Sequence, residues 1–228
     1  MHEGHRDRVK KRFRQEGLDH FSDIQALELL LFYGIPRVDT NPIAHALLDR
    51  FGSLSQVLEA SPEELMKVPG VGENAALLLT LIPQMGRFYM VDRSSRVTIL
   101  QTLEQCANFL VPHFFGRKVE TVFILCLDAK CKLLCCKELG EGGPNSTGVS
   151  IRKIVETAIG VNAATVVLAH NHPSGLAVPS AEDIQTTRQI AQALGAVEIA
   201  LADHIVVADE DYVSIAMSDD RFRDCLLI

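Results

Sequence analysis

The sequence predicts a mixed α/β domain preceded by a small all-α domain. The first 90 residues place apolar side chains at helical spacing, and residues 92–98 (DRSSRVT) are polar and small. After that stretch, short β-branched and apolar runs alternate with helical segments. We therefore expect an all-α domain over residues 1–91, a linker over 92–100 and an α/β domain over 101–228, which a chain of 228 residues can accommodate.

The all-α region is expected to hold several helices with recognisable start signals. Pro42 suits a first helical turn, and Ser61 is the expected N-cap of a later helix. Pro83 is expected to kink or break the last helix. The helices expected are Arg6–Gln15, Asp23–Tyr33, one that starts at Thr40-Asn41-Pro42, one that follows Ser61, and one from about Asn74 toward Met90.

The α/β region should form a sheet with flanking helices. Its apolar runs indicate buried strands, and Gly195 is the expected stop of the last long helix. The strands expected are Thr121–Leu127, Cys131–Lys137, Thr165–Ala169, Val197–Ala202 and His204–Ala208. The helices expected are Leu103–Phe115, Ile151–Ile159 and Ser180–Leu194.

Composition restricts the class of protein. Hydrophobic residues make up 47% and charged residues 22% of the chain, which favours a globular protein over a disordered one. Residues 1–14 carry six Lys or Arg against two acids while the whole chain has net charge −7, so the remainder is acidic and broad wrapping of a nucleic acid is disfavoured. No apolar run approaches a membrane span and no export signal is visible, so we expect a cytoplasmic protein without a membrane partner. The six cysteines form no C-x-x-C pair, which favours reduced thiols over a cysteine zinc site.

A metal-ligand pattern lies at the end of the expected strand Thr165–Ala169. His170 and His172, two residues apart as the chain leaves a strand, should point to one side, and Asp183 stands in the first turn of the following helix. Two imidazole nitrogens, one carboxylate oxygen and a vacant fourth position are typical of a catalytic zinc site. The alternative is structural: Ser180-x-x-Asp183 matches a helix capping box, although Asp is shorter than the usual Glu or Gln.

The same residues resemble a known family. His-x-His-Pro followed by Ser-x-x-Asp is similar to the motif of JAMM (MPN+) metalloproteases, and the string HNHPSG…PS..D, with Thr186 or Thr187 following it, resembles the bacterial RadC family. The resemblance extends to GHRDRVKKRF, LLLFYGIPRVDTNPIA, VPGVG and DHIVV, and so covers nearly the whole chain. It implies a JAMM/MPN-type, cytidine-deaminase-like mixed sheet with flanking helices, and His170, His172 and Asp183 as ligands of Zn²⁺.

The resemblance also implies catalytic roles. Ser180 matches the serine that supports the oxyanion, although it could instead act only as an N-cap. The general base of this family is an upstream glutamate near the start of an early strand. Glu120 is our choice and Glu138 the rival, while either could be a solvated strand end.

Two further positions leave alternatives open. Members of the RadC family usually have Gly-Thr-x-Asn after the strand that corresponds to Cys131–Lys137. This chain has Gly142-Gly143-Pro144-Asn145 instead, which puts the substrate contacts of that loop in doubt. His204 is either an outer partner of a metal ligand or an ordinary core histidine.

The segment LMKVPGVG resembles a helix-hairpin-helix, in which Gly70 and Gly72 allow a tight turn that presents backbone N–H groups to a phosphate. A purely structural connection uses the same residues, and Glu73 follows where strong DNA-binding hairpins carry Lys or Arg. Two functions are therefore expected: a zinc metallopeptidase or related amide hydrolase with a protein or peptide substrate, or a DNA-associated repair or recombination accessory protein with a structural or vestigial metal. A pure interaction module is disfavoured because the ligand set is complete.

Overall fold

The computed structural model describes residues 2–94, 99–142, 149–209 and 211–218. The chain forms two compact units, residues 1–86 and residues 87–228. Helix α6 (Glu73–Ser94) begins in the first unit and ends in the second. The domain limits expected from sequence, with a linker over 92–100, stay a prediction.

The first unit is helical. Ser61 is the N-cap of its fifth helix, as expected, since its hydroxyl accepts the backbone N–H of Glu64 at 3.3 Å. The buried core is formed by side chains such as Leu27, Leu47 and Leu79. In chain order the helices are α1 (His2–Glu16), α2 (Asp23–Gly34), α3 (Asn41–Phe51), α4 (Leu54–Glu59), α5 (Pro62–Leu65) and the start of α6.

Helix α6 continues through Pro83, where a kink or break was expected. A proline removes one backbone hydrogen bond of a helix, and the neighbouring turns can hold the rest. Here the side-chain amide of Gln84 also donates to the carbonyl oxygen of Thr80 at 3.3 Å. The predicted break is therefore wrong. None of the described helices is both long and apolar enough to cross a membrane.

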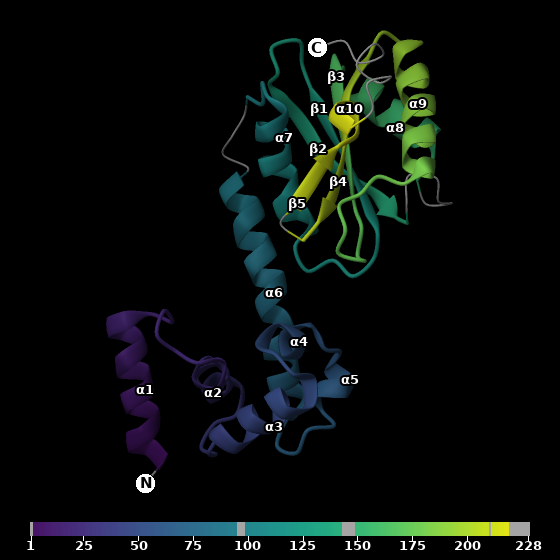
Figure 1. Cartoon of the computed structure of the whole chain (residues 1–228). Coiled ribbons are helices and arrows are strands. Elements are labelled where there is room, and N and C mark those ends of the chain that lie inside the picture. Colours follow the sequence, from purple (N-terminus) through teal and green to yellow (C-terminus); the bar gives the residue numbers. More distant parts are fainter. Residues whose placement is uncertain (1, 95–98, 143–148, 210, 219–228) are drawn as a thin grey trace. The chain divides into compact units, whose positions relative to one another are not determined.

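The second unit is built on a mixed five-stranded sheet in the order β2-β1-β3-β4-β5 (Figure 1). Strand β1 pairs antiparallel with β2 and β3, β3 pairs parallel with β4, and β4 pairs antiparallel with β5. The strands are β1 (Thr121–Leu127), β2 (Leu133–Glu141), β3 (Thr165–Asn171), β4 (Ala200–Ala208) and β5 (Asp211–Ser214). This confirms the predicted mixed α/β class.

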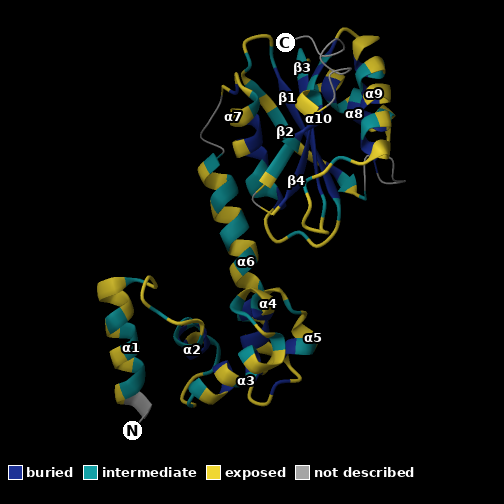
Figure 2. Cartoon of the chain, viewed as in Figure 1, coloured by how far each residue is buried: buried dark blue, intermediate teal, exposed yellow. Residues whose placement is uncertain are grey.

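Helices cover both faces of this sheet. Along β1, Val122, Ile124 and Cys126 pack with side chains of α8 (Ile151–Gly160) and α9 (Ala181–Gly195). The alternate residues of β1 pack instead with α7 (Leu103–Leu110) and the 3-10 turn η1 (Val111–Phe114). Because both of its faces are covered, β1 is buried at every position, and Figure 2 shows the central strands as the buried layer. A short α10 (Ile215–Ser218) follows β5.

The last strands differ from the expectation. Val197–Ala202 and His204–Ala208 were expected as separate strands, but a single strand β4 spans most of both, and the short β5 was missed. Asp203 lay between the two expected strands, yet it is buried within β4, where its Oδ1 accepts the backbone N–H groups of His204 and Ala216. Gly195 is the last residue of α9 rather than its stop, because Ala196 caps the helix in a right-handed conformation.

Candidate metal centre

Two histidines and an aspartate meet at the end of β3 beside the first turn of α9. His170 lies in β3, opposite Val122 of β1, and His172 follows two residues later, held by a hydrogen bond from its backbone N–H to the carbonyl of Val207 at 2.8 Å. The Nε2 atoms of the two imidazoles are 2.9 Å apart. Nε2 of His170 lies 3.3 Å from Oδ1 of Asp183, and Nε2 of His172 lies 3.5 Å from Oδ2 of Asp183. All three side chains therefore face one point.

The donor set fits a zinc ion. Ligands about 2.0–2.2 Å from a tetrahedral zinc are separated from one another by about 3.3–3.6 Å. The two distances to Asp183, 3.3 and 3.5 Å, lie in this range, and the two imidazole nitrogens, at 2.9 Å, are closer together. The Nδ1 atom of His172 faces the carbonyl oxygen of Leu176 at 3.2 Å. Since a carbonyl can only accept, the ring hydrogen belongs on Nδ1, and the lone pair of Nε2 is left toward the common point. His170, His172 and Asp183 are thus able to hold the metal.

Ser180 and Asp183 complete a capping box at the start of α9. The backbone N–H of Asp183 donates to Ser180 Oγ at 3.1 Å, and Oδ2 of Asp183 accepts the backbone N–H of Ser180 at 2.8 Å. The shorter Asp therefore caps this helix well, contrary to our expectation. The Ser180 hydroxyl also donates to Oδ2 of Asp183 at 2.6 Å. In this arrangement Ser180 is an N-cap, and its oxyanion role stays a prediction that requires the hydroxyl to turn.

The charge on Asp183 is strongly favoured. Burial alone would raise the pKa of this carboxyl, but its side-chain interactions with His170 and with Ser180 outweigh burial, and the pKa of Asp183 falls well below its usual range. Such a carboxylate is ionised at neutral pH and can act as a ligand without first losing a proton.

Glu120 belongs to the same group of side chains and stands slightly apart. Its Oε1 is 3.9 Å from Nε2 of His170, and its side chain is 34% exposed. Ligand atoms of Glu120, His170, His172 and Asp183 all lie within 4.8 Å of one another. Glu120 is therefore the most exposed member of this group, and its carboxylate can be reached from solvent.

Asn171 holds the segment that carries Glu120, a role the sequence analysis missed. Its side-chain oxygen accepts the backbone N–H of Thr121 at 2.8 Å, and its amide donates to the carbonyl oxygen of Val119 at 3.2 Å. Asn171 is 5% exposed, so these bonds are shielded from water. The available signal was a polar residue between two ligand candidates within an otherwise apolar strand.

The rival glutamate is engaged elsewhere. Glu138 lies in β2, where its Oε2 accepts a hydrogen bond from the Arg117 guanidinium at 2.7 Å. Glu138 is not among the residues grouped with the two histidines. Glu120, and not Glu138, is therefore the glutamate that lies beside the two histidines and Asp183. Residues 143–145 of the Gly142-Gly143-Pro144-Asn145 segment lie outside the described residues.

His204 contacts one of the ligand candidates, and its role as an outer partner stays a prediction. It is completely buried in β4, and its Nε2 lies 2.8 Å from Nδ1 of His170. Burial, followed by the neighbouring His170, lowers the pKa of His204 well below its usual value. A neutral imidazole in this place can orient a ligand histidine.

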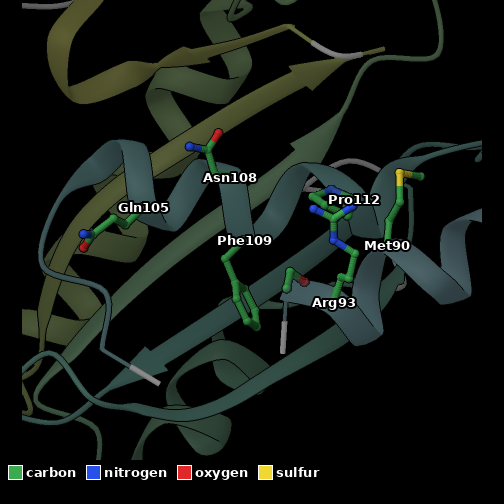
Figure 3. Close-up of a pocket in the computed structure, with 7 residues that line it drawn as sticks. Met90, Arg93, Gln105, Asn108, Phe109 and Pro112 are labelled. Carbon is green, nitrogen blue, oxygen red and sulfur yellow. The ribbon is translucent and has the colours of Figure 1, made fainter. Parts of the chain in front are cut away.

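Two cavities of the second unit lie away from these residues. One, of about 500 Å³, lies between the end of α6 and α7 with η1 (Figure 3) and is lined by Met90, Arg93, Ser94, Gln105, Asn108, Phe109 and Pro112. The other, of about 390 Å³, is mostly apolar and includes Asp203 in its wall. Neither cavity is lined by His170, His172 or Asp183, so both are separate from the candidate metal centre.

The glycines of the hairpin differ in their surroundings. Gly70 has a φ of +89°, a backbone conformation that favours glycine, and a Cβ at this residue would also lie 2.7 Å from Cδ1 of Ile43, whose side chain would have to shift. Gly72 has no heavy atom within 4 Å of such a Cβ. The turn thus joins α5 to α6 as a helix-hairpin-helix would, and phosphate binding at Gly70 and Gly72 stays a prediction.

Comparisons with known proteins agree with this architecture. A family model described as a RadC-like JAB domain matches residues 100–220, and one described as the UPF0758 N-terminal domain matches residues 3–77. A UPF0758 protein of Paraburkholderia xenovorans is 34% identical over 210 residues, which cover 92% of this chain and 83% of the relative. A second, from Paraburkholderia phytofirmans, is 35% identical over 92% of this chain and 81% of its own length. The chain therefore belongs to the RadC family, with a RadC-like JAB domain preceded by a UPF0758 N-terminal domain.

Proposed function

We propose that this protein is a zinc-dependent hydrolase that cleaves an amide bond, either peptide or isopeptide. The observation that carries the proposal is the convergence of His170, His172 and Asp183, with the partly exposed Glu120 beside them. The first three side chains would hold the ion. When bound, zinc supplies Lewis-acid polarisation of the substrate carbonyl and lowers the pKa of water toward neutrality.

The proton transfers are assigned to Glu120. Its carboxylate would take a proton from the attacking water and deliver it to the departing amine nitrogen. Asn171 keeps the segment 119–121 in place through the two hydrogen bonds to its backbone, so the carboxylate does not have to find its position in each cycle. Ser180 would donate to the carbonyl oxygen of the substrate after its hydroxyl turns away from Asp183.

The first test measures metal. Purified wild-type protein should contain close to one zinc per chain, and His172→Ala should contain far less while circular dichroism shows an unchanged fold. Equal, near-zero zinc in both proteins after incubation with excess zinc would reject the metal assignment.

The second test measures hydrolysis. Zinc-loaded protein is incubated with libraries of peptides and isopeptide-linked peptides, and new termini are identified by mass spectrometry. Glu120→Gln should retain zinc and lose turnover by about 10²-fold or more, whereas the matched variant Glu138→Gln should remain active. An active Glu120→Gln together with an inactive Glu138→Gln would reverse the assignment of the base.

DNA association is the second candidate function, and the tight turn between α5 and α6 is the observation that favours it. Part of the basic first helix is already engaged within its own unit, since Arg6 donates to the carbonyl oxygen of Ile35 at 2.8 Å and Arg12 to the side chain of Gln25 at 3.2 Å. The test is binding of the full chain to duplex DNA at several salt concentrations. Gly72→Asp adds a repelling charge where no packing conflict arises, so it should weaken binding if the turn contacts phosphate.

A further inference from the structure

A chain of hydrogen bonds joins His170 to Asp183 behind the metal centre. Nδ1 of His170 lies 2.8 Å from Nε2 of His204, and Nδ1 of His204 lies 2.6 Å from Oγ1 of Thr187. The Thr187 hydroxyl in turn donates to the backbone carbonyl oxygen of Asp183 at 2.6 Å. His170, His204 and Thr187 are each at most 1% exposed, so water does not compete for these groups.

The hydrogens along this chain can be assigned from its fixed end. A hydroxyl carries one hydrogen, and the Asp183 carbonyl can only accept, so the hydrogen of Thr187 points to that carbonyl. Thr187 must then accept from His204, which places the ring hydrogen of His204 on Nδ1.

The remaining contact fixes His170. A histidine that binds a metal through Nε2 carries its ring hydrogen on Nδ1, and Nδ1 of His170 faces Nε2 of His204, which can accept that hydrogen because the ring hydrogen of His204 is on Nδ1. The hydrogen of a neutral His170 is thereby held on Nδ1. The lone pair of its Nε2 is left toward His172 and Asp183.

We propose that Thr187 and His204 are positioning residues that hold His170 in its Nδ1–H tautomer, so that Nε2 is ready to bind metal before metal arrives. The proposal rests on the proposed zinc site and adds the residues that prepare it. Thr187 lies in α9 and His204 in β4, so their contact joins the start of α9 to the sheet, while the bond from Thr187 to the Asp183 carbonyl lies within α9. One side chain is thus linked both to the backbone of Asp183 and, through His204, to the ring of His170.

The direct test is a measurement on the metal-free full chain. Long-range ¹H–¹⁵N spectra of ¹⁵N-histidine-labelled protein, with His170→Gln used to assign the resonance, distinguish a protonated from a bare ring nitrogen. His170 should show hydrogen on Nδ1 and none on Nε2 near neutral pH. A wild-type His170 with its hydrogen on Nε2, or with both tautomers equally populated, would overturn the proposal without any need for a variant.

The second measurement uses variants and zinc affinity, determined by competition with a chelator. His204→Phe keeps a ring but removes the acceptor, and Thr187→Val keeps the shape but removes the hydroxyl. Both should mix the tautomers of His170 and weaken zinc binding by about 10- to 100-fold. His204→Gln supplies an acceptor oxygen, and Thr187→Ser restores the hydroxyl, so each should recover most of the loss.

The outcomes separate this proposal from the proposed hydrolysis. Unchanged tautomer and unchanged zinc affinity in folded Thr187→Val would reject the positioning role. If Thr187→Val does not fold, the wild-type protein and Thr187→Ser still test the tautomer of His170, because both proteins keep the buried hydroxyl. A protein that cleaves no peptide yet shows the expected spectrum and affinities would refute the hydrolase and leave the positioning role standing.

Discussion

Asp183 and Asp203 are both almost fully buried in the α/β unit, at 6% and 3% exposure, but their surroundings differ. Asp183 accepts two hydrogen bonds from Ser180 and faces two imidazoles, and its interactions with His170 and Ser180 lower its pKa despite burial. Asp203 accepts two backbone N–H groups on Oδ1, whereas its Oδ2 has no hydrogen-bond partner among the described residues, and burial raises its pKa.

The difference shows that burial of a carboxylate does not by itself indicate a functional group. Asp203 fastens α10 to β4 and lines an apolar cavity, which is a structural task. Asp183 caps a helix with one oxygen and presents the other to His170, so a local motif and a long-range contact share one side chain. Only Asp183 lies beside imidazole nitrogens, which can bind a metal ion together with its carboxylate.

The largest expected effect separates the two aspartates by zinc affinity. Asp183→Asn keeps the shape and an acceptor for the Ser180 N–H but removes the charged ligand, so zinc affinity should fall by more than about 100-fold. Asp203→Asn should leave zinc affinity within about threefold of the wild type. Chelator competition measures both. Similar losses in the two variants would mean that the contrast concerns stability rather than metal binding.

The next effect concerns Ser180, which supplies the donors that set Asp183 apart. Ser180→Ala removes a helix cap worth about 1 kcal/mol and, if the hydroxyl also serves the oxyanion, lowers kcat by about 100-fold at saturating zinc. Thr102→Ala removes the equivalent cap of α7, where Thr102 accepts the N–H of Gln105, and should cost similar stability with unchanged kcat. Equal kcat in both variants would restrict Ser180 to capping.

A smaller effect is expected at the third carboxylate, Glu120, through the residue that holds its segment. Asn171→Ala removes both bonds to the backbone of residues 119 and 121, so kcat should fall by about 10-fold because the base is less well placed. Zinc content should not change, since Asn171 is not a ligand candidate. Loss of zinc in a folded Asn171→Ala would show that the clamp supports the ligands instead of the base.

Most of the fold could be predicted from sequence because its signals are local. Strand β1 matches its expected limits, since Val122–Leu127 is a run of apolar residues that is short for a helix and suits a strand covered on both faces. The local pattern failed at β4, where two strands were expected on either side of Asp203 and a single strand is found. Asp203 is satisfied there by the backbone of α10, a contact that no local pattern reveals.

The candidate site divides in the same way. The spacing of His170, His172 and Asp183 could be read from the chain, because a strand followed by a turn and a helix start places such residues within reach of one another. The partnership of Asn171 with residues 119 and 121 spans about fifty positions and depends on the β1–β3 register. The chain of hydrogen bonds through Thr187 and His204 likewise depends on how α9 meets β4.

The smallest expected effect is a difference in acid response between the two aspartates, measured on zinc-free protein by chemical unfolding. A raised folded-state pKa means that the folded protein holds the proton more tightly than the unfolded chain, so Asp203 makes the wild type relatively more stable as pH falls from 7 toward 4. Asp203→Asn should lack this gain, at about 1.4 kcal/mol for each pKa unit of the shift. Asp183, with its lowered pKa, should have the opposite sign: its contribution is present above about pH 4 and is lost as pH falls further through its folded-state pKa. If both Asn variants changed the slope in the same direction, the donors around Asp183 would not be controlling its charge, and the distinction between the two buried aspartates would fail.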